Sequence, residues 1–308
     1  MKIAVVGCGA MGSVYAALLH DAGHEVWAVD VWEDHVNAIK NKGLRLDGAS
    51  GSRVARLYAT CNFEDVGICD LVILATKVMH VEKAARASKV LISEKTDVIS
   101  IQNGLGGPKT AENILGKNKV IVGVVGGFGS SIKEPGHAHH NGWELVRLGE
   151  LSKPKTERLE TVAAVWKSAG FRVECFDDID QLVWEKLICN ACFSATCAVT
   201  GLTIGEVMND SDSWICASNC ALEAYNVAIA KSIKLRIDDV VSYVWRFGSN
   251  IPNARPSMLL DHMSRRMSEI DAINGAITIE GSTVGQATPF NLAISSLIRN
   301  KERQMGVR

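Results

Sequence analysis

Three glycines near the start of the chain could hold the phosphates of a nucleotide. Gly7, Gly9 and Gly12 form a G-x-G-x-x-G pattern directly after a short apolar run. In such a turn the first glycine permits a sharp bend, the second lets the backbone approach a pyrophosphate, and the third lets the following helix pack closely on a sheet. The first turn of that helix offers unpaired N–H groups and the positive end of its dipole. The residues predicted to bind the pyrophosphate are Gly7, Cys8, Gly9, Ala10, Met11 and Gly12.

An acid at position 30 could select the form of the cofactor. Asp30 ends a second apolar run, and residues 31–34 contain neither arginine nor lysine. A carboxylate at this place accepts a hydrogen bond from the adenosine ribose 2′-OH and repels a 2′-phosphate. We therefore expect NAD(H) rather than NADP(H), and keep NADP(H) as the alternative.

The chain around these residues has the order that a dinucleotide site requires. An apolar, β-branched strand is predicted at 2–6, a helix follows the glycines and ends at Gly23, and a second strand is predicted at 26–29. A glycine turn that binds nothing is the alternative for an isolated motif. Strand, turn, helix, strand and acid within about thirty residues favour the dinucleotide site.

A polar stripe in the second half of the chain could do acid–base chemistry. Lys186, Asn190 and Ser194 recur at i, i+4 and i+8, so they share one face of a helix predicted at 181–200. Their neighbours in the sequence are mostly apolar. Burial would lower the pKa of a lysine and would suit Lys186 to donate a proton to a carbonyl oxygen. A lysine whose stem lies along the helix surface and whose ammonium reaches solvent is the alternative.

A second polar segment favours the catalytic interpretation of the lysine. Ser257 is predicted as the N-cap of a helix over 257–274, with free N–H groups after it. Glu269 and Asp271 would lie near the end of that helix, where the helix dipole disfavours carboxylates. Acids in that place indicate a specific partner, and ordinary surface acids are the alternative.

Strands alternate with helices as far as residue 177, which predicts a doubly wound parallel sheet. After the first two strands, further buried strands are expected at 70–76, 97–101 and 120–125. Ligands of such sheets gather beyond the carboxyl ends of the strands. The candidate residues that follow these strand ends, and that we therefore expect on one edge of the sheet, are Asp30, Lys77, Asn103 and Gly129.

From residue 178 onward the pattern becomes almost wholly helical. Helices are expected at 181–200, 213–232, 237–247 and 257–274, with a terminal helix that opens at 288–290. The predicted fold class is therefore α/β, with an N-terminal Rossmann-type doubly wound sheet over 1–177 and a C-terminal all-α domain over 178–308.

Histidines at 137, 139 and 140 could suggest a metal site. Residues 136–148 alternate like antiparallel strands, and no cysteine or carboxylate stands at ligand spacing in the sequence. We expect strand or surface histidines here and no bound metal.

Composition limits the classes of partner. The chain has 308 residues, of which 47% are hydrophobic and 22% charged, and its formal net charge is −1. Such a balance offers no basic field for nucleic acid or for an anionic membrane. No apolar run is expected to reach the roughly 18–20 residues that span a bilayer. Nine cysteines without a leader sequence indicate reduced thiols and a cytoplasmic protein.

Taken together, the motifs resemble the ketopantoate reductase (2-dehydropantoate 2-reductase) family over essentially the full length of the chain. The resemblance implies a Rossmann domain joined to a helical domain, with substrate in the cleft between them, and NAD(P)H-dependent reduction of 2-dehydropantoate to (R)-pantoate. It also implies a place in pantothenate biosynthesis. The segments that carry the resemblance are the glycine turn at 7–12, Ala75-Thr76-Lys77, Gln102–Gly106, Trp184–Leu187 with Asn190, Arg255–Met258 and Glu269–Gly275.

The resemblance also implies a role for each candidate residue. Lys186 would be the general acid that protonates the keto oxygen, and Glu269 would orient the catalytic and cofactor groups. Lys77 and Asn103 would line the edge where cofactor and substrate meet. The residues implied to bind substrate are Asn103, Asn190, Ser194 and Ser257.

Three positions depart from the family pattern. The family usually has asparagine where Ser194 and Ile204 stand, and these amides help to hold the far hydroxyl of ketopantoate. Ser194 can still bond a hydroxyl, but Ile204 cannot. Asp30 departs as well, since members of the pantothenate pathway commonly use NADPH.

These departures leave alternatives open. One is an NAD-dependent D-2-hydroxy acid dehydrogenase similar to D-mandelate dehydrogenase, acting on branched or aromatic 2-keto acids. Another, of a different class, is a dinucleotide-binding sensor without turnover. A homodimer is expected by analogy with the family alone.

Overall fold

The computed structural model describes residues 1–126, 129–143, 145–151 and 154–308. It divides into two compact units, one of residues 1–102 with 106–179 and one of residues 103–105 with 180–308. The division falls close to the expected boundary. The grouping of residues 103–105 with the helical unit, however, has no signal in the sequence.

The first unit is built on an eight-stranded sheet in the order β12-β11-β8-β7-β6-β1-β2-β5. The section from β5 to β8 has the Rossmann strand order, which confirms the predicted fold class. The sheet is not wholly parallel, because β11 runs antiparallel to β8. The strands are β1 Lys2–Val6, β2 Glu25–Val29, β5 Tyr58–Thr60, β6 Leu71–Leu74, β7 Asp97–Ser100, β8 Val120–Val125, β11 Leu145–Glu150 and β12 Arg172–Phe176.

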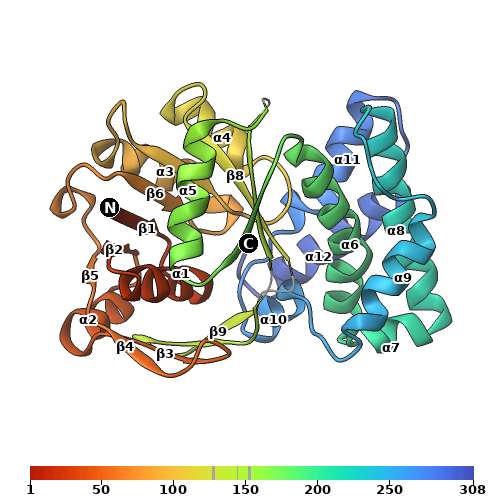
Figure 1. Cartoon of the computed structure of the whole chain (residues 1–308). Coiled ribbons are helices and arrows are strands. Elements are labelled where there is room, and N and C mark those ends of the chain that lie inside the picture. Colours follow the sequence, from red (N-terminus) through yellow and green to blue (C-terminus); the bar gives the residue numbers. More distant parts are fainter. Residues whose placement is uncertain (127–128, 144, 152–153) are drawn as a thin grey trace. The chain divides into compact units, whose positions relative to one another are not determined.

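The central strands are mostly apolar because both faces of the sheet are covered. In β1, Ile3 and Val5 join one hydrophobic core, whereas Ala4 and Val6 join another. Helices α1 and α5 contribute to the first core, and α3 and α4 to the second (Figure 1). These helices are α1 Ala10–Asp21, α3 Val81–Ala87, α4 Gly107–Leu115 and α5 Glu157–Ser168; α2 is Glu33–Lys42, and the short 3-10 turns are η1 Phe63–Asp65, η2 Val78–His80 and η3 Ser88–Leu91.

A smaller sheet contains the first part of the segment 136–148. Its order is β4-β3-β10-β9, with β3 Leu44–Gly48, β4 Arg53–Ala55, β9 Ser130–Glu134 and β10 His137–His140. The antiparallel strands expected over 136–148 are present as β10 and β11, each with an antiparallel neighbour, although β10 belongs to this sheet and β11 to the large one. The alternation of apolar and polar residues indicates that one face of each strand is buried, but it does not indicate with which strand each one pairs. Here β10 pairs antiparallel with β9 and parallel with β3.

Two histidines of β10 contact a carboxylate on β3. His137 Nε2 lies 2.7 Å from Asp47 Oδ2, and His139 Nδ1 pairs with the other oxygen of Asp47. Hydrogen bonds from His139 and His137 lower the pKa of the Asp47 carboxyl. Among the described residues, no group of histidine, cysteine and acidic side chains is arranged to hold a metal ion.

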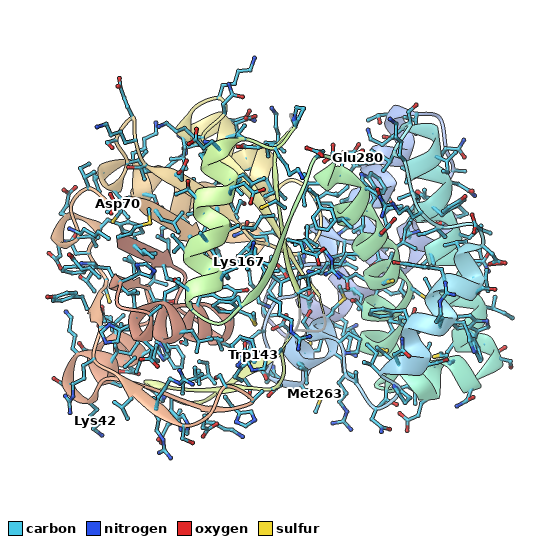
Figure 2. All side chains as sticks on the ribbon, viewed as in Figure 1. Lys42, Asp70, Trp143, Lys167, Met263 and Glu280 are labelled. Atoms are coloured by element: carbon cyan, nitrogen blue, oxygen red, sulfur yellow. The ribbon has the colours of Figure 1, made fainter. Side chains whose placement is uncertain are left out.

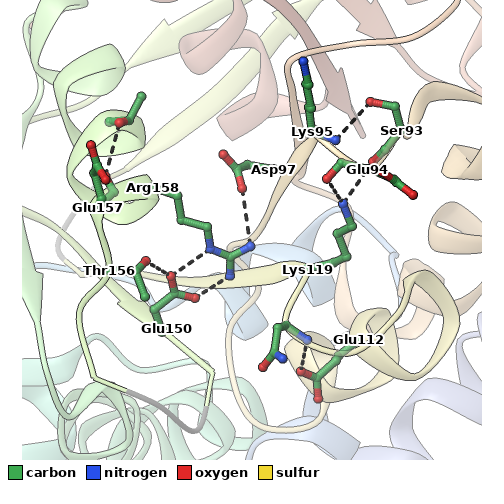
Figure 3. A network of polar contacts seen from close by, with 12 residues as sticks. Ser93, Glu94, Lys95, Asp97, Glu112, Lys119, Glu150, Thr156, Glu157 and Arg158 are labelled. Atoms are coloured by element: carbon green, nitrogen blue, oxygen red, sulfur yellow. Dashed lines mark hydrogen bonds and ion pairs between the residues drawn. The ribbon is translucent and has the colours of Figure 1, made fainter.

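An ion network lies at the edge of the large sheet opposite to the carboxyl ends of its parallel strands. Arg158 donates to Glu150 through Nε at 2.8 Å and contacts Asp97 through Nη1 at 3.4 Å (Figure 3). Asp97 begins β7, and Glu150 ends the antiparallel strand β11, so both lie at the amino end of β7. The network therefore joins strands and α5 away from the edge where ligands of such sheets gather.

The second unit is all helical, as predicted, but one helix was wrongly extended. We expected a helix over 257–274, whereas α10 ends at Met263, Arg265 has a left-handed φ of 50°, and Asn274 begins α11.

Met263 is exposed at the end of α10, and Lys42 and Lys167 are exposed on the first unit (Figure 2). The elements are α6 Ile179–Thr200, α7 Ile204–Asn209, α8 Ser211–Ala230, α9 Val240–Asn250, α10 Ser257–Met263, η4 Ile270–Ala272, α11 Asn274–Thr283 and α12 Pro289–Gln304.

The long helix α6 needs a second correction. The sequence was expected to hold no apolar run of spanning length, but α6 has 22 residues and a window of mean hydropathy 1.3, which suffices by length and composition. In the structure 67% of that window is buried. Trp184, Leu187 and Ile188 belong to the hydrophobic core of the helical unit, so α6 packs as a core helix.

Candidate active site

The glycine turn between β1 and α1 has the shape of a phosphate-binding turn. Gly7 has a φ of +90°, and a Cβ there would lie 2.6 Å from the backbone nitrogen of Thr76. A Cβ on Gly12 would lie 2.1 Å from the carbonyl oxygen of Gly7. Gly9 caps α1 without any side-chain hydrogen bond, and no atom lies within 4 Å of the place where its Cβ would stand. The turn is closed toward the sheet and open at the helix N-terminus, where a pyrophosphate would fit.

The acid at the end of β2 is fixed by a local hydrogen bond. Asp30 Oδ1 accepts from the backbone N–H of Trp32 at 3.0 Å. The next helix, α2, begins with Glu33 and Asp34. Because three carboxylates follow one another closely here, a 2′-phosphate would meet like charges, whereas a ribose hydroxyl would meet an acceptor.

A tryptophan and a histidine beside this acid had no signal in the sequence motifs. The Trp32 ring stacks on His35 with ring centroids 5.0 Å apart. His35 Nδ1 accepts from the N–H of Gly136 at 3.0 Å, and its Nε2 lies 3.3 Å from Ser13 Oγ, which donates to the Cys8 carbonyl. Burial lowers the pKa of His35. A neutral imidazole therefore links α2 to the glycine turn.

Two further cofactor candidates lie beyond strand ends, as expected from the topology. Lys77 follows β6 and caps the short 3-10 turn η2. Gly129 precedes β9, and its carbonyl accepts from Asn141 N at 2.8 Å. The glycine-rich sequence before it includes Gly127 and Phe128, which lie outside the described residues. No contact in the first unit tests the role of Lys77 or Gly129, so both stay predictions.

In the helical unit, three candidate residues form one hydrogen-bonded chain. Lys186 Nζ donates to Asn103 Oδ1 at 2.7 Å, and Asn103 Nδ2 donates to Glu269 Oε2 at 3.3 Å. The amide is thereby oriented with its oxygen toward the ammonium and its NH₂ toward the carboxylate. Because Lys186 has a specific partner, the alternative of a lysine extending alone into solvent does not describe it.

The segment 103–105 is pinned to the segment that carries Glu269. The N–H of Leu105 donates to the carbonyl of Ala272 at 2.8 Å. Gly104 has a φ of +79°, and a Cβ there would lie 2.2 Å from the same carbonyl oxygen. Leu105 packs against the core of the helical unit. A glycine is required at 104 because the two backbones touch, and this contact sets where Asn103 stands.

The remaining substrate candidates are not joined to this chain by any hydrogen bond that we observe among the described residues. Asn190 and Ser194 continue the face of α6, where Asn190 is half-buried and Ser194 is buried. Ser257 is exposed, and it is the first residue of α10 rather than its N-cap, which is Pro256. The N-cap prediction was wrong because the preceding proline already adopts the extended conformation that a cap needs.

Glu269 and Ile204 also stand elsewhere than expected. Glu269 does not lie near the end of a long helix; it is the N-cap of η4, between α10 and α11. The argument from an unfavourable dipole therefore does not hold, although the specific partner that it suggested exists. Ile204 begins α7 and belongs to the hydrophobic core, where a Cβ on Gly248 would lie 3.1 Å from its Cγ2.

A Rossmann sheet with a glycine turn open at α1, and a helical unit with a lysine–amide–carboxylate chain, define a dinucleotide-dependent oxidoreductase. Comparison with known proteins supports this class and narrows it. The family model described as Ketopantoate reductase PanE/ApbA matches residues 3–153, and the model of its C-terminal part matches residues 178–302. The chain belongs to the ketopantoate reductase family.

Individual relatives agree with this assignment. The chain is 31% identical to a 2-dehydropantoate 2-reductase of Lactococcus lactis, with 98% of each chain covered. A ketopantoate reductase of this family from Ralstonia eutropha has a TM-score of 0.92 at 31% identity and covers 99% of this chain and 100% of its own. A structure of D-mandelate dehydrogenase with NADH and anilino(oxo)acetate has a TM-score of 0.92 at 28% identity and covers 100% of both chains.

Proposed function

We propose that this chain reduces a 2-keto acid to a 2-hydroxy acid, with 2-dehydropantoate as the default substrate and (R)-pantoate as the product. When bound, a reduced nicotinamide supplies the hydride that adds to the keto carbon. The Lys186 ammonium gives a proton to the keto oxygen, so that one hydride and one proton reduce the carbonyl to an alcohol. The observation that carries the proposal is the chain Lys186–Asn103–Glu269.

The hydrogen bonds among Lys186, Asn103 and Glu269 explain how the lysine is held in place to donate a proton. The Asn103 oxygen accepts one N–H of the ammonium and so fixes the direction of the lysine side chain. The Glu269 carboxylate, which is largely buried, polarises the amide through its NH₂ group and so makes the amide oxygen that Lys186 contacts a stronger acceptor. We also propose that substrate is bound by four polar residues of the helical unit, Asn103, Asn190, Ser194 and Ser257.

For the cofactor we propose NAD(H). Asp30 lies where the adenosine ribose would bind, and the neighbouring Glu33 and Asp34 add negative charge. The glycine turn, with Gly7, Gly9 and Gly12 as its frame, would hold the pyrophosphate. Lys77 and Gly129 would contact the cofactor beyond the strand ends. NADP(H) is the competing form.

A D-2-hydroxy acid dehydrogenase acting on branched or aromatic keto acids is the second candidate. Asp30 favours it, because it argues for NAD(H). Ile204 favours it too, because the residue lies in the hydrophobic core and offers no amide to a hydroxyl of ketopantoate. A site that binds a hydroxyl through polar groups discriminates strongly, whereas an apolar site accepts apolar side chains.

Steady-state kinetics separate the candidates. The purified chain is assayed with 2-dehydropantoate, 2-ketoisovalerate and benzoylformate, each with NADH and with NADPH. If kcat/KM is at least tenfold higher on 2-ketoisovalerate or benzoylformate than on 2-dehydropantoate, then 2-dehydropantoate is not the native substrate. Tight NADH binding without reduction of any 2-keto acid would support the sensor alternative instead.

Two further parts of the proposal concern the setting of the enzyme. A homodimer is proposed from the family alone, and light scattering on the purified chain tests it. A cytoplasmic location is proposed from the reduced state expected of the thiols; all nine cysteines are free in the structure.

A further inference from the structure

The segment that carries Glu269 has little regular structure of its own. It runs from the end of α10 at Met263 to the start of α11 at Asn274, with only the short turn η4 between. A segment of this kind is held by side chains or water, because its backbone polar groups lack a ladder of partners. The identity of those side chains decides how exactly Glu269 is placed.

A buried carboxylate on α12 holds the residue directly before Glu269. Glu302 Oε1 accepts from the backbone N–H of Ser268 at 2.8 Å and from its hydroxyl at 2.5 Å. Glu302 is 0% exposed, and its remaining partners are Arg308 Nε at 2.7 Å and His262 Nε2 at 3.3 Å. Both oxygens of the carboxylate therefore accept hydrogen bonds, and Ser268 is bound through its backbone and its side chain.

Asp271, two residues after Glu269, is held from the same helix by Arg299 and by Arg308, which follows the helix. Asp271 Oδ1 accepts from Arg299 Nε at 2.7 Å, and Asp271 Oδ2 pairs with Arg308 Nη1 at 2.8 Å. Arg308 thus bridges Glu302 and Asp271. The segment is clamped to α12 on both sides of Glu269, with the buried clamp on the Ser268 side.

We propose that Glu302 is a positioning residue for the Lys186–Asn103–Glu269 chain: by fixing Ser268 it sets the distance between the Glu269 carboxylate and the Asn103 amide. The proposal rests on the proposed function and adds to it a residue that contacts neither substrate nor cofactor. It makes α12, which carries none of the motifs, part of the catalytic arrangement.

The geometry leaves little margin for movement. The bond from Asn103 Nδ2 to Glu269 Oε2 is 3.3 Å long. A hydrogen bond of this kind weakens steeply toward about 3.5 Å, so a shift of a few tenths of an ångström would break it. Ser268 is one peptide unit from Glu269, and that unit is planar and stiff, so a displacement of Ser268 moves Glu269 with it. A misplacement of about 1 Å can cost up to about 10²-fold in rate.

The variant Glu302→Gln tests the proposal. Glutamine keeps the volume but has one acceptor oxygen, so it cannot hold both Ser268 and Arg308 as the carboxylate does. We expect kcat on the preferred keto acid to fall about tenfold, with KM for NADH unchanged. Ser268→Ala removes only the hydroxyl contact and should lower kcat by a smaller factor, which keeps the test available if the glutamine variant fails to fold.

Glu223→Gln is the matched control. Glu223 on α8 is also a buried carboxylate that holds α12, but it accepts from Phe290 N at 2.8 Å and from Asn291 N at 2.9 Å. Its hydrogen bonds therefore anchor the start of α12. They reach the far end of the segment of Glu269 through Asn291, whose Oδ1 accepts from Asn274 Nδ2 at 2.9 Å, whereas Glu302 bonds Ser268 directly. Both variants should lower thermal stability, whereas only Glu302→Gln should lower kcat.

A readout that needs no turnover separates this proposal from the proposed function. The side-chain NH₂ signal of Asn103 in a ¹⁵N spectrum, assigned by its loss in Asn103→Asp, reports the bond to Glu269. It should move in Glu302→Gln and stay in Glu223→Gln. If the wild type reduces no keto acid but this signal responds, the proposed function fails and the positioning role stands. An active wild type with unchanged kcat and an unchanged signal in Glu302→Gln and in Ser268→Ala would overturn the positioning role.

Discussion

The ammonium of Lys186 is bonded to the amide oxygen of Asn103 at 2.7 Å, although 83 residues separate them in the chain. Asn103 follows a strand of the Rossmann sheet, yet it belongs to the helical unit. A residue from the Rossmann part of the sequence thus completes the hydrogen-bonded chain of the helical unit.

Removal of the lysine should abolish most of the turnover. Lys186→Ala should lower kcat by about 10²-fold or more, the usual contribution of a general acid. NADH binding, measured by fluorescence titration, should stay within the error of the wild type because the glycine turn is untouched. Wild-type turnover in this variant would remove Lys186 from the mechanism.

The contact between Gly104 and Ala272 should matter more than the left-handed backbone alone. Gly104→Ala places a Cβ 2.2 Å from a carbonyl oxygen, whereas Gly106, with a φ of +94°, has open space around it. Both substitutions carry a backbone strain of about 1–2 kcal/mol. We expect Gly104→Ala alone to lower kcat, by about tenfold. Equal kcat in both variants would show that the close approach does not position Asn103.

The acid at the end of β2 should set the cofactor preference. Asp30→Ala removes the acceptor for the ribose 2′-OH and a charge that repels a 2′-phosphate. The ratio of kcat/KM for NADH to that for NADPH should fall, and Asp30→Ala combined with Val31→Arg should lower it further. A wild type that already prefers NADPH would contradict this account of Asp30.

Glu302 should also make stability depend on pH. Burial raises the pKa of its carboxyl, but hydrogen bonds from Ser268, with further ones from Arg308 and His262, bring it below the ordinary value of 4.5. A carboxyl whose pKa is lower in the folded state stabilises the fold above its unfolded pKa, and this contribution is lost as the pH falls through the folded value.

Urea unfolding of the wild type and of Glu302→Gln at several pH values measures this contribution. The difference in unfolding free energy between the two proteins should be constant near pH 7 and should shrink below about pH 4.5. A difference that stays constant down to pH 3.5 would mean that folding does not lower the pKa of this carboxyl.

Much of the fold could be predicted because its signals are local. The run at 3–6 is apolar at every position because the strand is covered on both faces, and Gly23 ends α1 because the chain turns left-handed there, with a φ of +87°. The glycine turn is recognisable as well, because Gly7, Gly9 and Gly12 stand within six residues directly after the strand.

The errors have a common physical cause. The helix over 257–274 was extended too far because Glu269, Asp271 and Asn274 continue a plausible helical pattern, whereas the chain leaves the helix to meet Glu302 and Arg299 on α12. No spacing within 257–275 contains that information. The same holds for Asn103, whose placement depends on a backbone contact with Ala272.

The close approach of Gly104 to Ala272 has a consequence for anyone who divides this protein. A cut at the apparent linker near residue 178 would yield a helical fragment without Asn103 and without the leucine that fills its core beside it. Such a fragment would keep the lysine and lose the amide that orients it. The unit that holds Lys186, Asn103 and Glu269 together is therefore not a continuous stretch of the sequence.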